Sequence, residues 1–233
     1  MLRQNFADAD NVLVVSVHPD DETLGAGGTL LKHKYNGDKI FCIFCTDIYE
    51  EDGFSKNQVE KRKEEIRQVC KMYNFDGIFH LGLKTTKIDE CPKSLLVDKF
   101  SKIFTVVKPN IVYLPFAYDV HSDHRVIFET AYACTKSFRY PSIRKVLMME
   151  TLSETEFSPA ILGQNFIPNV FVDVTDFFDS KCDIMKIYES ELGVLPFPRS
   201  IENLKALALH RGCTFGGKNR IYAESFMLLK ERT

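Results

Sequence analysis

Two short clusters of histidine and carboxylate residues are the part of this sequence that could do chemistry. Residues 18–22, His-Pro-Asp-Asp-Glu, follow directly on an apolar run at 12–17. Residues 119–124, Asp-Val-His-Ser-Asp-His, follow another apolar run at 111–115. Histidines and carboxylates are ligands that catalytic zinc takes, with three protein groups and a water in the open position. Clusters on two strand ends can converge on one point, which we interpret as a metal site.

The first cluster has a geometry that suits one shared cation. Proline biases the residue before it toward an extended conformation, so the proline after His18 holds this histidine at the strand exit. The chain turns directly afterwards, and residues i and i+3 across such a turn can face the same side. His18 and Asp21 can therefore share one cation, while Asp20 points elsewhere, close to the metal but free of it. The third ligand must come from a distant part of the chain, and the second cluster offers His121 and His124.

Each of these residues also has a purely structural interpretation. Paired aspartates such as Asp20 and Asp21 usually cap a helix and complement its dipole, which contributes about 1 kcal/mol. A lone loop histidine is usually solvated, and we interpret His33, His80 and His210 as structural or surface residues. Capping does not explain two separate clusters that both follow apolar strands. The joint pattern favours the metal site.

Short apolar runs alternate with longer segments of helical character along the chain. Strands that are apolar almost throughout are typical of a parallel sheet buried on both faces. The alternation predicts an α/β fold with a Rossmann-like, doubly wound, mainly parallel sheet and helices on both faces. In such sheets ligands bind outside the carboxyl ends of the strands, where both clusters fall. We expect strands over 11–17, 39–45, 77–81, 110–115, 146–149 and 170–174, helices over 22–36, 57–74, 94–108, 124–138, 177–190 and 201–211, and a last segment at 220–229.

The sequence predicts one domain over residues 1–233. Residues 1–150 would form the Rossmann-like core, and residues 151–233 a C-terminal elaboration that shapes the substrate side. No repeat, low-complexity tract or convincing linker divides the chain.

Two other motifs invite functions that their spacing does not support. The glycines of the run 25–28 follow the first strand, but a dinucleotide-binding loop would need a glycine where Leu30 stands. We interpret these glycines as positions of close backbone packing. Cys42 and Cys45 match a Cys-x-x-Cys pattern inside a strand, where residues three apart point to opposite faces. We expect them to be core residues.

Composition and charge exclude several classes of protein. The chain has 233 residues, 45% of them hydrophobic, which allows a sizeable core. Its formal net charge of −2 argues against general nucleic-acid binding. No apolar stretch reaches the roughly 18 residues that span a bilayer. Residues 1–8 are polar and do not resemble a signal peptide, so we expect a cytoplasmic protein. Its seven cysteines, an odd number, are expected to be reduced thiols.

The two clusters also carry a resemblance to a known family. His-Pro-Asp-Asp-Glu after the first strand, followed by His-x-Asp-His at 121–124, resembles the N-acetylglucosaminyl deacetylases, the LmbE-like, PIG-L group of zinc-dependent amidohydrolases. The resemblance implies that Asp20 is the general base and that His121 and Asp123 assist as catalytic residues. A protonated His121 would stabilise the carbonyl oxygen, and Asp123 would keep His121 oriented and charged. The implied zinc ligands are His18, Asp21 and His124.

The implied reaction is removal of an N-acetyl group from an N-acetylglucosamine-type amino sugar, a glycoconjugate or a related small amide. Zn²⁺ is the implied cofactor, and Fe²⁺ could fill the same site in the cell. Arg62 and Arg125 are candidates for gripping a phosphate or a pair of sugar hydroxyls, with solvated charges as the alternative. The loop at 47–51 departs from the family pattern, so specificity does not transfer. Assembly into a homo-oligomer is left open.

Two other functions are open to the same residues. Two histidines and one carboxylate are also the ligands of non-haem iron(II) oxygenases, although these enzymes need no neighbouring base like Asp20. The chain could instead be a non-catalytic α/β binding module whose clusters are helix caps, and it would then bind no metal. Metal content and oxygen consumption separate the three functions.

Overall fold

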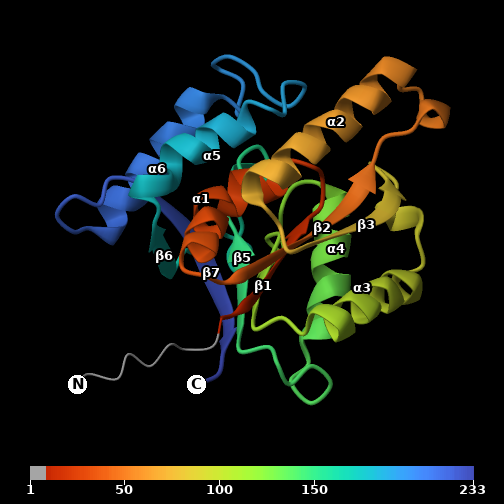
Figure 1. The fold of residues 1–233 in the computed structure, drawn as a ribbon, viewed down its shortest axis with the longest axis horizontal. Coiled ribbons are helices and arrows are strands. Elements are labelled where there is room, and N and C mark those ends of the chain that lie inside the picture. Colours follow the sequence, from red (N-terminus) through yellow and green to blue (C-terminus); the bar gives the residue numbers. More distant parts are fainter. Residues whose placement is uncertain (1–8) are drawn as a thin grey trace.

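Within residues 9–233, the part of the chain that the structure (a computed structural model) describes, seven strands form one sheet. The polar run at 1–8, on which the absence of a signal peptide was predicted, lies outside the described residues. The strand order is β3-β2-β1-β4-β5-β7-β6 (Figure 1). The pairs among β1 to β5 are parallel, and β7 is antiparallel to both of its neighbours. The strands are β1 (Asn11–Ser16), β2 (Lys39–Asp47), β3 (Gly77–Lys84), β4 (Ile111–Leu114), β5 (Lys145–Met149), β6 (Val170–Asp173) and β7 (Ala223–Glu231).

Helices cover both faces of this sheet (Figure 1). Side chains of α1, α2, α5 and α6 pack with Val14 in one core, and those of α3 and α4 pack with Leu13 in another. These neighbours in β1 enter different cores because strand side chains alternate between faces. The α-helices are α1 (Asp21–Tyr35), α2 (Lys56–Tyr73), α3 (Lys93–Val107), α4 (Ser122–Tyr132), α5 (Phe178–Met185) and α6 (Ile201–Phe215). Short 3₁₀ helices are η1 (Glu50–Asp52), η2 (Ile88–Glu90), η3 (Ala133–Thr135), η4 (Thr155–Phe157) and η5 (Thr175–Phe177).

The predicted Rossmann-like, doubly wound sheet is confirmed, and two helices end earlier than expected. The helix expected over 124–138 stops at Tyr132, because Cys134 has non-helical backbone angles and the Thr135 carbonyl accepts a hydrogen bond from Lys230 of β7. The helix expected over 177–190 stops at Met185, and the residues after it turn back toward α1 and α2. In both places a tertiary contact overrides the local helical pattern.

Residues after position 150 complete the sheet with β6 and β7 and cover it with α5 and α6. The division into a core at 1–150 and an elaboration at 151–233 of one domain stays a prediction. Among residues 9–233, no helix combines the length and the apolar character that crossing a membrane requires.

The glycine and cysteine interpretations agree with the packing. A Cβ added at Gly28 would lie 2.7 Å from the Cβ of Val174, so only glycine allows this approach of α1. Cys42 is buried in the core under α1 and Cys45 in the core on the opposite face of the sheet. These two thiols diverge as the strand geometry predicts.

Candidate metal centre and active-site cavity

The turn after β1 brings His18 and Asp21 together. The Asp21 N–H donates to the His18 carbonyl at 3.2 Å, and the His18 N–H donates to Asp21 Oδ2 at 2.7 Å. The His18 ring nitrogen Nδ1 lies 3.9 Å from the same carboxylate oxygen. The i and i+3 positions therefore share one side of the turn, as the sequence predicts.

His124 reaches this turn from the neighbouring strand. β4 pairs directly with β1, and α4, which follows β4, carries His124 in its first turn. The imidazole is fully buried, and its Nε2 lies 3.3 Å from Asp21 Oδ2 without a hydrogen-bond partner among the described residues. One ligand atom each from His18, Asp21 and His124 lie within 4.8 Å of one another. These three residues could hold a metal ion.

Two further carboxylates orient the histidines. His124 Nδ1 donates to Asp119 Oδ2 at 2.9 Å, which turns its Nε2 toward Asp21. His18 Nε2 donates to Asp123 Oδ2 at 3.1 Å, which leaves its Nδ1 on the Asp21 side. Metal-binding histidines usually donate their other ring nitrogen to a carboxylate in this way. Both imidazoles are therefore fixed as metal-site histidines are.

A second group, His18, His121 and Asp123, also gathers within 4.8 Å, but its atoms are already engaged. The Asp123 carboxylate accepts hydrogen bonds from the N–H groups of Thr86 and Ile88 in addition to His18. His121 Nδ1 accepts the Asp123 N–H at 3.1 Å. A cation here would have to displace these bonds, whereas His124 Nε2 has no such partner.

The charges around His124 fit a divalent cation. Although burial by itself lowers the pKa of His124, the Asp21 and Asp119 carboxylates outweigh it and raise this pKa well above its ordinary value. Burial likewise opposes the charge on Asp21, yet His124 and His18 hold the pKa of Asp21 below its ordinary value. The space between Asp21 and His124 thus favours positive charge, which a bound cation would supply in place of the proton.

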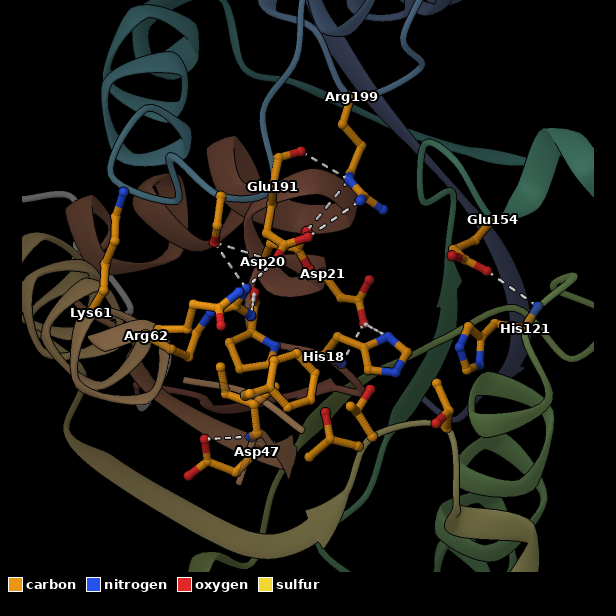
Figure 2. Close-up of a pocket in the computed structure, with 18 residues that line it drawn as sticks. His18, Asp20, Asp21, Asp47, Lys61, Arg62, His121, Glu154, Glu191 and Arg199 are labelled. Atoms are coloured by element: carbon orange, nitrogen blue, oxygen red, sulfur yellow. Dashed lines mark hydrogen bonds and ion pairs between the residues drawn. The ribbon is translucent and has the colours of Figure 1, made fainter. Parts of the chain in front are cut away.

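Asp20 occupies the N-cap position of α1, but its side chain makes no capping hydrogen bond to the helix. Its φ of 146° is a conformation that costs a non-glycine residue about 1–3 kcal/mol. The carboxylate lines the cavity, with Arg199 Nε 3.9 Å from Asp20 Oδ2 (Figure 2). Burial, and then the Asp21 carboxylate, raise the pKa of Asp20 well above its ordinary value, and Arg199 opposes this shift. A carboxylate that makes no capping hydrogen bond, on a strained backbone, is better explained by a role in catalysis than by helix stability.

His121 begins helix α4 as its N-cap and lines the cavity. Because its Nδ1 accepts the Asp123 N–H, its Nε2 carries the proton when the ring is neutral. Burial, followed by the neighbouring His18, lowers the pKa of His121. The sequence predicted a protonated His121 supported by the Asp123 carboxylate. The lowered pKa and the Asp123 N–H on Nδ1 instead favour a neutral imidazole, while the Asp123 carboxylate lies 3.9 Å from His121 Nδ1 and accepts a hydrogen bond from His18.

A cavity of about 490 Å³ opens over these residues. His18, Asp21 and His121 lie side by side on one side of it, and Arg62, Glu191 and Arg199 lie along another wall (Figure 2). The other lining residues come from the turn after β1, the ends of β2 and β3, helix α2 with the loop before it, and loops after β5: Pro19, Asp20, Thr46, Asp47, Ile48, Phe54, Gln58, Lys61, Thr85, Thr86, Glu154 and Ser190.

Of the two arginines expected to contact substrate, the structure brings one to this cavity. Arg62 lines it, but its guanidinium is largely buried and pairs with Glu191, so it is not a solvated charge. Arg125 does not line the cavity. Its guanidinium donates to the backbone carbonyls of Asp119 and Val120 and braces the loop that carries the second cluster.

Sequence reasoning missed four residues of the site. Asp119 belonged to the second cluster but received no role, although an acidic residue five positions before His124 is a usable signal for its hydrogen-bond partner. Glu154, Glu191 and Arg199 come from loops without a motif, and only the fold brings them to the cavity. Burial raises the pKa of Glu154 to about 7, and its carboxylate accepts a hydrogen bond from the backbone N–H of His121 at 3.2 Å.

The fold and this geometry define a Rossmann-like α/β protein with a largely buried cluster of two histidines and one carboxylate. Next to this cluster lies Asp20, whose backbone is strained and whose carboxylate faces a cavity. The model of the PIG-L family, described as GlcNAc-PI de-N-acetylase, matches residues 13–135 and so includes both clusters. This is more than half of the chain, and the chain belongs to this family. The predicted class, a hydrolytic N-deacetylase of the PIG-L group, is confirmed.

Known relatives extend the similarity beyond the family match. The chain is 26% identical over 238 residues to a diacetylchitobiose deacetylase from Thermococcus kodakarensis, covering 96% of this chain and 84% of the relative. It is 24% identical to a probable N-acetyl-alpha-D-glucosaminyl L-malate deacetylase 2 from Bacillus subtilis, covering 78% of this chain and 83% of that protein. The solved N,N'-diacetylchitobiose deacetylase from Pyrococcus horikoshii shares the fold, with a TM-score of 0.73, 23% identity and coverage of 99% and 87%.

Proposed function

We propose that this protein is a zinc-dependent hydrolase that removes the N-acetyl group from an N-acetylglucosamine-type amino sugar or its glycoconjugate. The observation that carries this proposal is Asp20, whose backbone is strained and whose carboxylate makes no capping hydrogen bond but lines the cavity beside three residues arranged as metal ligands. Family membership and two relatives named as deacetylases of N-acetylated sugars support the substrate class.

In this proposal His18, Asp21 and His124 hold the zinc ion. The orphaned, buried Nε2 of His124 and the carboxylate behind each histidine support this ligand set over the alternative one. Zinc supplies positive charge that acidifies water and draws electron density from an amide carbonyl. Iron(II) has the same ligand preferences and could replace zinc in the cell.

Asp20 acts as the general base. Its carboxylate accepts a proton from the attacking water as the water oxygen bonds to the amide carbon. A cation held at the adjacent Asp21 favours the ionised form of Asp20, against the burial that raises its pKa. The same carboxyl then returns the proton to the nitrogen as the C–N bond breaks, so the products are a free amine and acetate.

His121 stabilises the carbonyl oxygen as a neutral donor. The Asp123 N–H occupies its Nδ1, so Nε2–H is free to donate to the oxygen on which negative charge grows. Asp123 assists by holding His121 through its backbone and His18 through its carboxylate. Neither contribution requires a protonated imidazole.

The cavity wall suits hydroxyl groups of a sugar. Asp47 and Glu154 both line the cavity, and their carboxylates accept hydrogen bonds from backbone N–H groups. Such carboxylates can accept further hydrogen bonds from sugar hydroxyls. Arg62 and Arg199 both form ion pairs with Glu191. Because this carboxylate already neutralises part of their charge, we propose that they form the cavity wall and do not bind an anionic group of the substrate.

No observation favours the oxygenase or the non-catalytic module. The cap interpretation of Asp20 is contradicted by its missing capping bond. A cytoplasmic location and the absence of nucleic-acid partners stay predictions.

A purified, zinc-loaded chain tests this proposal when it is incubated with N-acetylglucosamine conjugates, including N,N'-diacetylchitobiose. We expect equal amounts of free amine and acetate, without oxygen uptake. Oxygen consumption coupled to turnover would contradict hydrolysis, and full zinc loading without amine release from any conjugate would contradict the substrate class.

A further inference from the structure

Glu22 is a fully buried carboxyl for which the mechanism has no use. It lies behind the catalytic turn, in the first turn of α1, where it cannot reach the cavity. Its Oε2 lies 2.7 Å from Ser16 Oγ and accepts the Asp20 N–H at 3.2 Å. Its Oε1 lies 2.7 Å from Thr23 Oγ1 and accepts the Tyr188 hydroxyl at 3.0 Å. These bonds lead to the end of β1, to the turn that carries Asp20, to Thr23 in the first turn of α1 and to Tyr188.

Hydrogen bonds hold the backbone on both sides of Asp20, and one of them is made by Glu22. Glu22 holds the Asp20 N–H, and the Asp20 carbonyl accepts the N–H groups of Thr23 and Leu24. A residue at φ 146° keeps this conformation only where its surroundings over-determine it. The direction of the Asp20 side chain into the cavity thus depends on the bond from its own N–H to Glu22.

Tyr188 connects this bond to the far wall of the cavity. It follows α5, is fully buried and reaches Glu22 across 166 positions of sequence. The next residues contact α2: Glu189 pairs with Lys61 at 2.7 Å, and Ser190 accepts a hydrogen bond from Arg62 at 3.0 Å. One short segment, 188–191, therefore contacts both the support of Asp20 and the wall that the substrate would meet.

We propose that Glu22 and Tyr188 are positioning residues for the reaction, which hold the strained backbone of Asp20 so that its carboxylate meets the attacking water. The proposal rests on the proposed function, in which Asp20 is the base. Neither residue touches the substrate. A buried hydroxyl–carboxyl hydrogen bond is not needed to fill a core, since replacing both partners by apolar groups of the same shape can be nearly neutral or even stabilising. Alignment of Asp20 gives this pair a purpose that packing does not.

Tyr188→Phe tests the proposal, because it removes one hydroxyl and keeps the ring. The matched control is Tyr73→Phe, whose hydroxyl is equally buried but donates to Thr23 Oγ1 at 3.0 Å and reaches Glu22 only through that threonine hydroxyl. Misplacement of a reacting group by about 1 Å can cost 10²-fold, so we expect kcat of Tyr188→Phe to fall about 10-fold, with KM and zinc content unchanged. Tyr73→Phe should keep the wild-type kcat.

A double-mutant cycle separates positioning from mere structure. If Tyr188 acts through Asp20, the Tyr188→Phe effect should vanish in the Asp20→Asn background, whereas a general structural defect would persist there. Glu22→Gln, which keeps the shape, should lower kcat at least as much as Tyr188→Phe.

Two failures are distinguishable. Wild-type kcat in Tyr188→Phe, or an undiminished effect in the Asp20→Asn background, would overturn the positioning role while Asp20 remains the base. Wild-type turnover in Asp20→Asn alone would remove the proposed function and the positioning role together.

Discussion

Replacing Asp20 by asparagine separates catalysis from metal binding. Asparagine has the same shape and, like aspartate, is among the residues that best tolerate positive φ, so the turn at φ 146° should persist. The substitution leaves His18, Asp21 and His124 in place, and zinc should bind as in the wild type. Only the ability to accept the proton of the attacking water is lost.

The expected magnitude comes from the role and the surroundings of Asp20. General base catalysis contributes about 10²–10⁴-fold, so kcat should fall by that factor. The stability of the variant, unlike its kcat, should not fall. In the metal-free folded protein the pKa of Asp20 is raised, chiefly by burial and by Asp21, so ionised Asp20 destabilises the metal-free fold at neutral pH. Metal-free Asp20→Asn protein should therefore melt at the same temperature as metal-free wild type or higher.

The assay follows amine release from an N-acetylglucosamine conjugate by the zinc-loaded variant, with zinc content measured on the same sample and melting temperature measured after zinc removal. Asp183→Asn is the control, because Asp183 lies on the surface of α5 and pairs with Lys186. Turnover of Asp20→Asn near the wild-type rate, at full zinc content, would refute the base assignment. Loss of zinc from this variant would refute the separation of base from ligands.

Four further measurements test the site and the packing. His124→Ala should lose zinc, measured by metal analysis after dialysis, because it removes the ligand nitrogen that lacks any other partner; retained stoichiometric zinc would contradict the ligand set. Asp119→Asn should weaken zinc binding by about 10–100-fold in a chelator competition, because a partner of this kind orients the ligand histidine, and an unchanged affinity would argue against that support. Zinc affinity should rise with pH from about 6 to 8, since zinc must displace a proton from His124, whose pKa is raised in the metal-free protein. Because of the same raised pKa, the metal-free fold loses stability as pH rises through that pKa. The gain in melting temperature on adding zinc should therefore grow with pH, and a gain that shrinks would contradict this charge state. Gly28→Ala should lower the free energy of unfolding by about 1–3 kcal/mol in urea denaturation, because its Cβ would meet Val174 at 2.7 Å, and wild-type stability would show that α1 can shift.

Much of the fold follows from the sequence because the strands of a parallel sheet are continuous apolar runs. The first four strands and three helices start and end within three residues of their predicted bounds, since the apolar runs and the helical patterns both stop where the chain turns. The ends of α4 and α5 could not be predicted. They depend on the bond from Lys230 to the Thr135 carbonyl and on the bond from Tyr188 to Glu22, which join distant parts of the chain.

The candidate site, like the fold, has a part that the local sequence predicts and a part that depends on distant contacts. The His-Pro-Asp-Asp turn is local, so the shared side of His18 and Asp21 was predictable from four residues. The choice of His124 over His121 by geometry, and the bond of the Asp123 carboxylate to His18, required the pairing of β4 with β1, which brings the first turn of α4 to the turn after β1. The cavity wall built by Glu154, Glu191 and Arg199 has no sequence signal, because charged loop residues acquire partners only when the chain folds.

Anomalous diffraction at the zinc edge, from crystals of the zinc-loaded chain, tests the central claim most directly. We predict one strong peak at about 2.0–2.2 Å from His18 Nδ1, Asp21 Oδ2 and His124 Nε2, with the Asp20 carboxylate nearby but outside bonding distance. A peak bound by His121 and Asp123, or no zinc bound within residues 9–233, would contradict the account.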